Sequence, residues 1–427
     1  MSAARLLYTL LLLIAAPLIP LRLLWRARRQ PAYLRHLGER FGFYAAPPRA
    51  PLIWLHAVSV GETRACAPLI AALRQRFPEH TILLTHMTPT GRETSEQLYG
   101  DRVLRCYLPY DYPFAVSRFL AHFQPCLGLL VETEVWPNLI AACHARAMPI
   151  ALINARLSQK SAQRYRRVAR LARETFGGLS RVCAQTAADA QRLSALGARD
   201  VQILGNLKFD IAPPDQAPAH AAHLRTLFGT RPVLLLASTR EGEEAPLLDA
   251  FTRSTTPRPL LVIVPRHPQR FDAVGDLIAH HGLNYQRRSA DEAIRPDTDV
   301  VLGDSMGEMF TYYGAADLAF VGGSLLPFGG QNLIEACAMG TPVLVGPHTF
   351  NFAEATQQAV ERGAAQRVGD ADALFHAARD LLANDAARAQ MRTAGYAFWQ
   401  QNQGAATRTV AALAALLNCD ASDTIRP

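Results

Sequence analysis

Short apolar runs alternate with longer stretches of helical periodicity over most of this chain. The first series of apolar runs predicts strands at residues 52–58, 81–85, 103–107, 126–131, 149–153, 180–184 and 201–204. The second series predicts strands at residues 233–237, 260–264, 299–302, 317–321 and 342–345. Strands that alternate with helices are typical of a parallel, doubly wound α/β sheet. The pattern therefore predicts two Rossmann-like domains, one for each series.

The segment DIAPPDQAPAH, residues 210–220, separates the two series. Its proline and alanine content is typical of a linker between domains. We therefore predict a first domain over residues 26–210, a linker over 211–220 and a second domain over 221–400, followed by a helical tail over 401–427. Two such domains that face each other across a cleft bind ligands at the carboxyl ends of their strands. Functional side chains should therefore follow strands directly.

Residues 1–25 differ from the rest, because residues 6–21 are apolar throughout and arginines follow them. This run is shorter than the about 20 residues of a membrane span, but the next residues can lengthen it while Arg22 extends toward the surface. A cleaved signal peptide has its cations before the apolar run, whereas here the main cluster comes after it. We therefore predict a retained membrane anchor, with the basic flank and the rest of the chain in the cytoplasm. Pro17 and Pro20 weaken a straight span, so a helix that lies in the membrane interface is the alternative.

The net charge of +8 is concentrated in two stretches of the chain. Residues 1–49 hold eight arginines and one acid, and residues 156–173 hold seven cations and no acid. Neither stretch is interleaved with stacking aromatic residues, which argues against a nucleic-acid surface. The second stretch suits a phosphate-bearing acceptor or an anionic lipid surface, and equally suits a solvated helix face.

The residues that most often bind metals or form disulfides are scattered. The seven cysteines include no CxxC pair, which is typical of reduced thiols rather than of a disulfide framework or a zinc site. Two Asp-x-Asp segments, 297–299 and 370–372, precede a strand and a helix instead of following a strand. We therefore predict neither a metal nor a cofactor.

A glycine-rich loop follows the strand at 317–321. Four glycines lie between residues 322 and 330, and a helix is predicted over 331–339. Glycine lets the backbone approach a ligand closely, and the free N–H groups at a helix start attract phosphate. Glu335, one turn into this helix, can accept hydrogen bonds from a ribose. A tight strand–helix turn without a ligand is the alternative.

Glu62 follows the strand at 52–58, in the segment HAVSVGET. Gly61 permits the turn, and a helix is predicted to begin at Glu62 and to end near Phe77. A helix N-terminus stabilises a carboxylate as the anion, so Glu62 is expected to be ionised at neutral pH and available as a general base. A plain capping role is the alternative.

Other charged residues also follow strands of the first series. Glu132 and Glu134 come directly after the strand at 126–131, and one of them is expected to cap the next helix. Lys208 follows the strand at 201–204, where it either places a positive charge in the cleft or remains a solvated lysine beside the linker.

The second series has similar strand ends. Arg266 and His267 follow the strand at 260–264, and they can hold a phosphate or cap a helix. Gly307 and Glu308 follow the strand at 299–302, where they can line a nucleotide pocket.

Nine short segments of the chain are similar to those of a known enzyme family. The segments are HAVSVGE (56–62), ETEVWPN (132–138), NARLS (154–158), GNLKFD (205–210), PRHP (265–268), GDSMGE (303–308), FVGGSL (320–325), GGQNLIEA (329–336) and GPHTFNF (346–352). Their order and combination resemble the 3-deoxy-D-manno-octulosonic acid (Kdo) transferases of lipopolysaccharide synthesis. The likeness runs from about residue 30 to residue 400.

The resemblance implies a GT-B fold and an inverting transferase that moves Kdo from CMP-Kdo to lipid IVA, the tetraacylated disaccharide bisphosphate precursor of lipid A. It also implies a place at the bacterial inner membrane, on the cytoplasmic face. Glu62 matches the general base, and Glu132 and Lys208 match residues that stabilise the transition state. The positions that match CMP-contacting residues are Pro265, Arg266, Met306, Gly307, Glu308, Asn332, Leu333, Ile334 and Glu335. Gln331 and Leu333 replace the histidine and proline that are commoner in the family, which alters a detail of nucleotide contact.

Two other functions stay open at this point. One is a GT-B transferase that uses a UDP-sugar on a lipid acceptor, which the HAVSVGE and GNLKFD segments argue against. The other is a membrane-tethered nucleotide-binding protein without catalysis, which Glu62 and Lys208 argue against. The chemistry of Kdo transfer needs little more than one base on the acceptor hydroxyl and cations on the departing phosphate.

Overall fold

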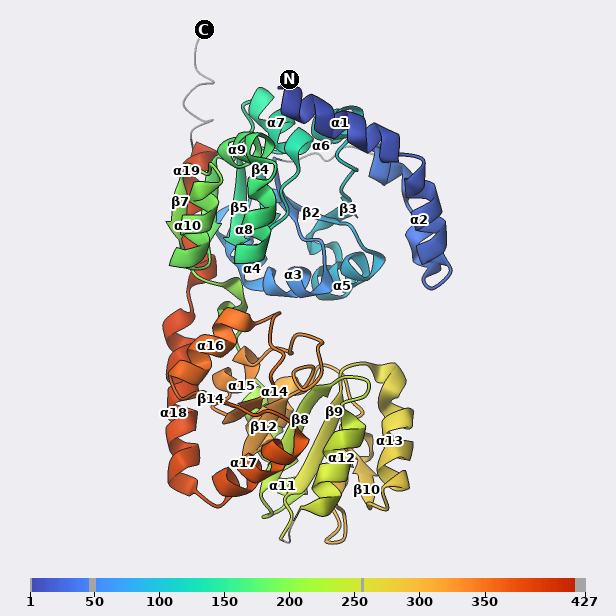
Figure 1. Cartoon of the computed structure of the whole chain (residues 1–427), viewed down its shortest axis with the longest axis vertical. Coiled ribbons are helices and arrows are strands. Elements are labelled where there is room, and N and C mark those ends of the chain that lie inside the picture. The colour runs from blue at the N-terminus through green and yellow to red at the C-terminus, as the bar shows by residue number, and fades with distance from the viewer. Residues whose placement is uncertain (1, 46–50, 255–256, 419–427) are drawn as a thin grey trace. The chain divides into compact units, whose positions relative to one another are not determined.

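The computed structural model describes residues 2–45, 51–254 and 257–418 (Figure 1). Arg49 of the N-terminal basic stretch and residues 419–427 of the predicted tail therefore lie outside the described residues. The chain divides into two compact units: residues 1–211 with 403–427, and residues 212–402. Each unit is built around its own parallel sheet.

The sheet of the first unit has the strand order β3-β2-β1-β4-β5-β6-β7, and every pairing in it is parallel. The strands are β1 (Leu52–His56), β2 (Thr81–His86), β3 (Leu104–Tyr107), β4 (Leu127–Val131), β5 (Ile150–Ala155), β6 (Arg181–Ala184) and β7 (Val201–Ile203). Leu52 and Trp54 belong to one buried apolar cluster, and Ile53 and Leu55 belong to another. Successive strand residues point to opposite faces, so both faces of the sheet are covered. The seven predicted strands of this half are confirmed.

The helices of the first unit follow its strands in turn. They are α3 (Val60–Ala65), α4 (Ala67–Arg76), α5 (Pro89–Tyr99), α6 (Pro113–Phe123), α7 (Pro137–Ala145), α8 (Gln159–Arg166), α9 (Ala169–Gly177), α10 (Ala187–Ala195) and α19 (Ala405–Asn418). The last of these belongs to the C-terminal end of the chain, which returns to pack on α4 (Figure 1). Asp210 holds its start, because the carboxylate accepts the N–H groups of Gly404 and Ala405 at 2.6 and 3.2 Å. Residues 403–418 are thus part of the first unit and not a separate tail.

The N-terminal segment forms two helices, α1 (Ala3–Ala15) and α2 (Leu18–Ala27), which are bent by 54° at the break near Pro17. Among the described residues, no single helix is long and apolar enough to cross a membrane, although this bent pair passes a test of length and composition. One side of α1 packs on the first unit, where the hydroxyl of Thr9 contacts Asn138 at 3.2 Å. Its other side presents exposed leucines and Ile14.

The sheet of the second unit has the strand order β10-β11-β9-β8-β12-β13-β14, again parallel throughout. The strands are β8 (Val233–Thr239), β9 (Leu260–Pro265), β10 (Tyr285–Arg287), β11 (Val300–Leu302), β12 (Leu318–Val321), β13 (Val343–Val345) and β14 (Ala365–Arg367). The five predicted strands are confirmed. The edge strands β10 and β14 were not predicted, because each has only three residues and polar side chains prevail in them.

The helices of the second unit cover both faces of this sheet. They are α11 (Ala217–Phe228), α12 (Glu244–Arg253), α13 (Phe271–His280), α14 (Met309–Ala315), α15 (Ile334–Ala338), α16 (Ala353–Glu361), α17 (Ala371–Leu382) and α18 (Asp385–Asn402). Helix α11 begins inside the predicted linker 211–220, since Pro218 is compatible with a first helical turn. Helix α15 is shorter than the predicted helix over 331–339, because residues 331–333 remain in the loop.

Candidate active site

Glu62 is held rigidly at the start of α3. Ser59 is the N-cap, and its hydroxyl oxygen accepts the N–H of Glu62 at 3.4 Å. In return the Glu62 carboxylate accepts the Ser59 hydroxyl at 2.9 Å and the Val58 N–H at 2.8 Å. This reciprocal arrangement is a variant of the capping box, in which the carboxylate accepts the N–H of Val58 instead of that of the N-cap residue. The predicted capping role is therefore real, and it fixes the position of the carboxylate.

The protonation of Glu62 differs from the sequence-based expectation. Burial raises its pKa to about 7, and the charges of Glu132 and Glu134 add to the rise, while the bonds from Val58 and Ser59 oppose it. The carboxyl is therefore only partly ionised at neutral pH. The predicted helix from Glu62 to near Phe77 is interrupted at Cys66, where α3 ends and α4 begins, and α4 ends at Arg76. At Glu62, desolvation outweighs the favourable effect of the helix N-terminus.

Glu132 lies at the carboxyl end of β4 with two cations around it. Its carboxylate is 2.9 Å from Nε of Arg156 and 3.4 Å from Nζ of Lys208. Glu132 is buried and has a φ of +61°, a conformation that is costly for a residue with a side chain and is often found at functional sites. Glu132 and Lys208, which come from distant parts of the sequence, are thus brought together.

The loop that carries Lys208 is fixed by asparagine side chains. Oδ1 of Asn206 accepts the N–H of Lys208 at 3.0 Å, and Oδ1 of the buried Asn154 accepts the N–H of Leu207 at 3.0 Å. Asn154 is the next-to-last residue of β5 and has a φ of +48°. The Lys208 side chain is only 14% exposed and its ammonium is paired with Glu132, so the alternative of a freely solvated lysine is wrong.

Glu62, Glu132 and Lys208 form one electrostatic group. The buried thiol of Cys66 has its pKa raised by burial and by the charges of both glutamates, and Lys208 opposes that rise. Glu134 also belongs to this region. Its carboxylate accepts the indole N–H of Trp136 at 3.1 Å, and burial raises the pKa of Glu134.

The glycine loop of the second unit is organised by a residue that the sequence analysis did not select. Glu243 is fully buried, and its carboxylate accepts the N–H groups of Arg240, Gly323 and Leu325 at 2.8, 2.6 and 2.9 Å. A Cβ on Gly322 would lie 2.7 Å from a backbone oxygen of Ser238, so only glycine fits there. The loop is therefore tied to the start of α12.

Arg266 and the end of the glycine loop lie side by side. Nε of Arg266 donates to Oε1 of Gln331 at 3.3 Å. The amide of Asn332 donates to the carboxylate of Glu335 at 3.0 Å, which orients that carboxylate. Leu333 and Ile334 are each 1% exposed, so their side chains belong to the core and only their backbone atoms can reach a ligand.

The remaining predicted donor-site residues lie at the ends of the neighbouring strands β9 and β11. Pro265 is the last residue of β9. Met306 is 54% exposed, and Gly307 has a φ of +84°. Glu308 stands 3.4 Å from the guanidinium of Arg288. Since β9 and β11 are paired, these groups share one edge of the sheet.

Positive charge accumulates where β8 and β9 end. The pKa of His267 is lowered by burial and then by the charges of Arg240, Arg266 and Arg270. Arg270 is neutralised by the buried Glu244, at 2.6 Å. Arg240 and Arg266 lie near His267 in the same region, and their charge has the sign that suits an anionic ligand such as a phosphate.

Sequence reasoning missed two contributors, Glu243 and Ser59, and included Arg156 only as one cation of the 156–173 stretch. Arg156 comes directly after β5, and Glu243 comes shortly after β8. Both residues therefore lie just after a strand, which is the criterion that selected the other candidate residues. Ser59 and Glu62 also have the spacing of a capping box.

Comparison with known proteins first defines the class. Residues 247–398 match the family model of glycosyl transferases group 1. A crystal structure of a glycosyltransferase from Rickettsia africae superimposes with a TM-score of 0.57, covering 87% of this chain and 99% of that chain at 13% identity. That likeness shows the fold alone. Together with the two parallel-sheet units, these matches define a glycosyltransferase of GT-B architecture.

The family follows from the sequence relatives. Residues 35–211 match the model of 3-deoxy-D-manno-octulosonic-acid transferase. The 3-deoxy-D-manno-octulosonic acid transferase of Bordetella pertussis is 47% identical over 95% of this chain and 98% of its own length. That of Haemophilus influenzae is 40% identical, over 95% and 96%. The chain belongs to the 3-deoxy-D-manno-octulosonic acid transferase family.

Proposed function

We propose that this enzyme transfers Kdo from CMP-Kdo to lipid IVA with inversion at the anomeric carbon, and that Glu62 is the general base. The observation that carries the proposal is the environment of Glu62. The capping box fixes its carboxylate, and burial raises its pKa to about 7. A general base works best when its pKa is near the operating pH.

The transfer is a single displacement. The acceptor hydroxyl oxygen forms a bond to the anomeric carbon while the bond from that carbon to the phosphate oxygen of CMP breaks. CMP leaves with the electron pair, and the hydroxyl proton moves to Glu62. Glu132, buried beside Lys208 and Arg156, supplies negative charge for an oxocarbenium-like transition state.

We assign donor binding to the second unit. Arg266 offers a guanidinium for the phosphate, and the oriented carboxylate of Glu335 can accept from the ribose hydroxyls. The glycine loop is held beside these groups by Glu243, which accepts the N–H groups of Gly323 and Leu325. Family membership supports CMP-Kdo as the donor, and a UDP-sugar is the competing candidate.

We also propose that α1 and α2 hold the enzyme at the cytoplasmic face of the inner membrane by lying along the surface. The hydroxyl of Tyr8 donates to the Asp111 carboxylate at 3.0 Å, and Tyr112 donates to the carbonyl of Leu12 at 2.8 Å. These bonds attach one side of α1 to the protein. The opposite side exposes Leu7 and Ile14, which are 59% and 75% accessible, and such a face suits the membrane interface.

The central test compares Glu62→Gln with Glu96→Gln, which removes an exposed carboxylate from α5 of the same unit. Lipid products and released CMP are measured by mass spectrometry, with CMP-Kdo or UDP-hexoses as donors and lipid IVA as the acceptor. We expect Glu62→Gln to lose roughly 10²–10⁴-fold in kcat, with CMP affinity unchanged, and Glu96→Gln to resemble the parent. Near-parental turnover by Glu62→Gln would exclude it as the base, and turnover with UDP-hexoses alone would exclude the donor assignment.

A further inference from the structure

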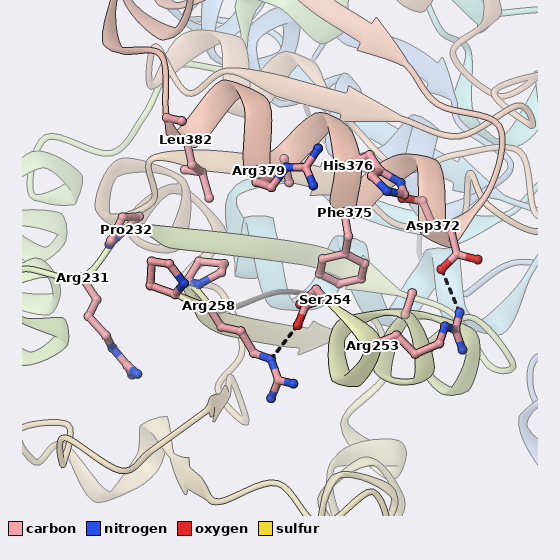
Figure 2. A pocket seen from close by; sticks show the side chains of 15 residues that line it. Arg231, Pro232, Arg253, Ser254, Arg258, Asp372, Phe375, His376, Arg379 and Leu382 are labelled. Carbon is pink, nitrogen blue, oxygen red and sulfur yellow. Dashed lines mark hydrogen bonds and ion pairs between the residues drawn. The ribbon is translucent and has the colours of Figure 1, made fainter.

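The second unit contains a cavity of about 580 Å³ at the amino-terminal edge of its sheet (Figure 2). Pro232 and Pro259 line it, and they directly precede β8 and β9. The candidate nucleotide residues follow the carboxyl ends of strands. The cavity therefore lies at the opposite edge of the same sheet and is a site of its own. Its volume is typical of pockets that bind small molecules.

One wall of the cavity is formed by α17. The other is formed by the end of α12 and by the residues that directly precede β8 and β9. Phe375, Ala378 and Leu382 supply apolar surface from α17. Figure 2 shows Phe375 pointing from this helix toward Ser254, with Leu382 lying near Pro232. Together with the prolines, these residues give a mostly apolar interior, which would bind a hydrocarbon portion of a ligand.

The rim of the cavity is strongly positive. Four arginines line it, Arg231, Arg253, Arg258 and Arg379, against one acid, Asp372. That acid is 2.7 Å from Arg253, so it neutralises only this one.

The other arginines have no acidic partner among the described residues that line the cavity. Arg231 and Arg258 donate to backbone carbonyls, those of Thr298 and Thr252, at 2.5 and 2.6 Å. A carbonyl group carries no net charge, so these hydrogen bonds do not neutralise the positive charge of either guanidinium group. Arg379 stands 3.1 Å from Asp380, which does not line the cavity. The lining thus combines an apolar interior with an excess of arginine.

We propose that this cavity binds an anionic amphiphile with a single hydrocarbon chain. The chain lies against Phe375 and Leu382, and the anionic head group is bound at the rim by Arg379. A guanidinium pairs with a carboxylate and with a phosphate equally well in geometry, so a fatty acid and an alkyl phosphate share the required chemistry. A free inorganic anion would leave the apolar interior unused, and a neutral lipid would leave the arginines unused.

The test uses the full chain in a neutral detergent and a decanoate that carries a photoreactive diazirine on its chain. After irradiation, labelled peptides are mapped by tandem mass spectrometry. We expect labels within residues 250–254, 257–259 or 372–383, and competition by decanoate or decyl phosphate. Labels elsewhere only, or equal competition by decanol or by inorganic phosphate, would overturn the proposal.

Two variants and one matched control test the assignment of the residues. Arg379→Ala should reduce labelling about fivefold, which corresponds to the upper range for an exposed ion pair. Arg295→Ala, which removes another exposed arginine with an acidic neighbour in the same unit, should label like the parent. Ala383→Trp fills the exposed mouth of the cavity without removing charge and should also block labelling. Undiminished labelling in both Arg379→Ala and Ala383→Trp, with unchanged melting temperatures, would refute the site.

Discussion

The pH dependence of turnover gives a sharp test of the environment of Glu62. The perturbation is Ser59→Ala, which removes one of the two hydrogen bonds that favour the ionised carboxylate. The parent enzyme should lose activity as the pH falls through about 7, because the protonated base cannot accept the acceptor proton. Without the Ser59 hydroxyl, the charged form is less favoured, so the midpoint should move to higher pH.

The size of the shift follows from the strength of that bond. A hydrogen bond to a charged group contributes about 1.5–3 kcal/mol, and one pKa unit corresponds to about 1.4 kcal/mol. Ser59 is only partly buried, so we take the lower end and expect a shift of about one pH unit. At pH 6.5 the ionised fraction then falls roughly eightfold, and at pH 9 the two enzymes become nearly equal.

The assay is kcat/KM for the lipid acceptor from pH 6 to pH 9, with product measured by mass spectrometry and freshly prepared donor. Ser59→Ala also removes a helix cap, which costs about 1 kcal/mol of stability. Thr186→Ala is the matched control, because Thr186 and Asp189 form the same reciprocal cap on α10. Superimposable profiles for the parent and Ser59→Ala, or an equal shift in Thr186→Ala, would refute the reasoning.

Four further changes have defined outcomes. Glu243→Gln places amide hydrogens against backbone N–H groups, so at least one buried donor loses its partner; we expect about 1–3 kcal/mol lower stability and weaker CMP binding, and an unchanged melting temperature would contradict this. Arg266→Ala should weaken CMP binding at least about tenfold, as expected for a lost charge-assisted bond, when titrated by calorimetry; equal affinity would exclude the phosphate contact. Combining Leu11→Asp with Ile14→Asp should release the protein from anionic vesicles in a sedimentation assay while turnover of detergent-dispersed acceptor persists; continued sedimentation would contradict the surface-bound helix. Excess EDTA should leave turnover unchanged, and a loss that magnesium restores would contradict the expectation of a metal-free site.

The strands were predictable because parallel strands are buried on both faces and appear as continuous apolar runs. Every run selected from the sequence became a strand. The edge strands β10 and β14 lack that signal, since sequences such as YQR and AQR have little apolar character. The C-terminal helix was assigned to a tail because its partner is Asp210, far away in sequence. Contacts of that range leave no local pattern.

The site was predictable to the extent that its residues follow strands. Glu132 and Lys208 were selected individually, but nothing local reveals that their side chains meet at 3.4 Å. The role of Glu243 was hidden for a similar reason. A buried carboxylate that accepts several backbone N–H groups depends on a loop some 80 residues further along the chain. The types of charged residue and their spacing in the sequence indicate the chemistry of a site. The extent to which burial shifts the pKa of such a residue is known only from the folded structure.

Glu62 shows how the structural and catalytic interpretations of a carboxylate can both hold. A capping glutamate in water keeps a low pKa and serves only the helix. Here the same two hydrogen bonds fix the carboxylate, but burial and the nearby charges of Glu132 and Glu134 raise its pKa to about 7. The cap therefore supplies the position, and desolvation supplies the basicity. The capping position of Glu62 can be found from a sequence motif, whereas its raised pKa depends on how the first unit packs around it.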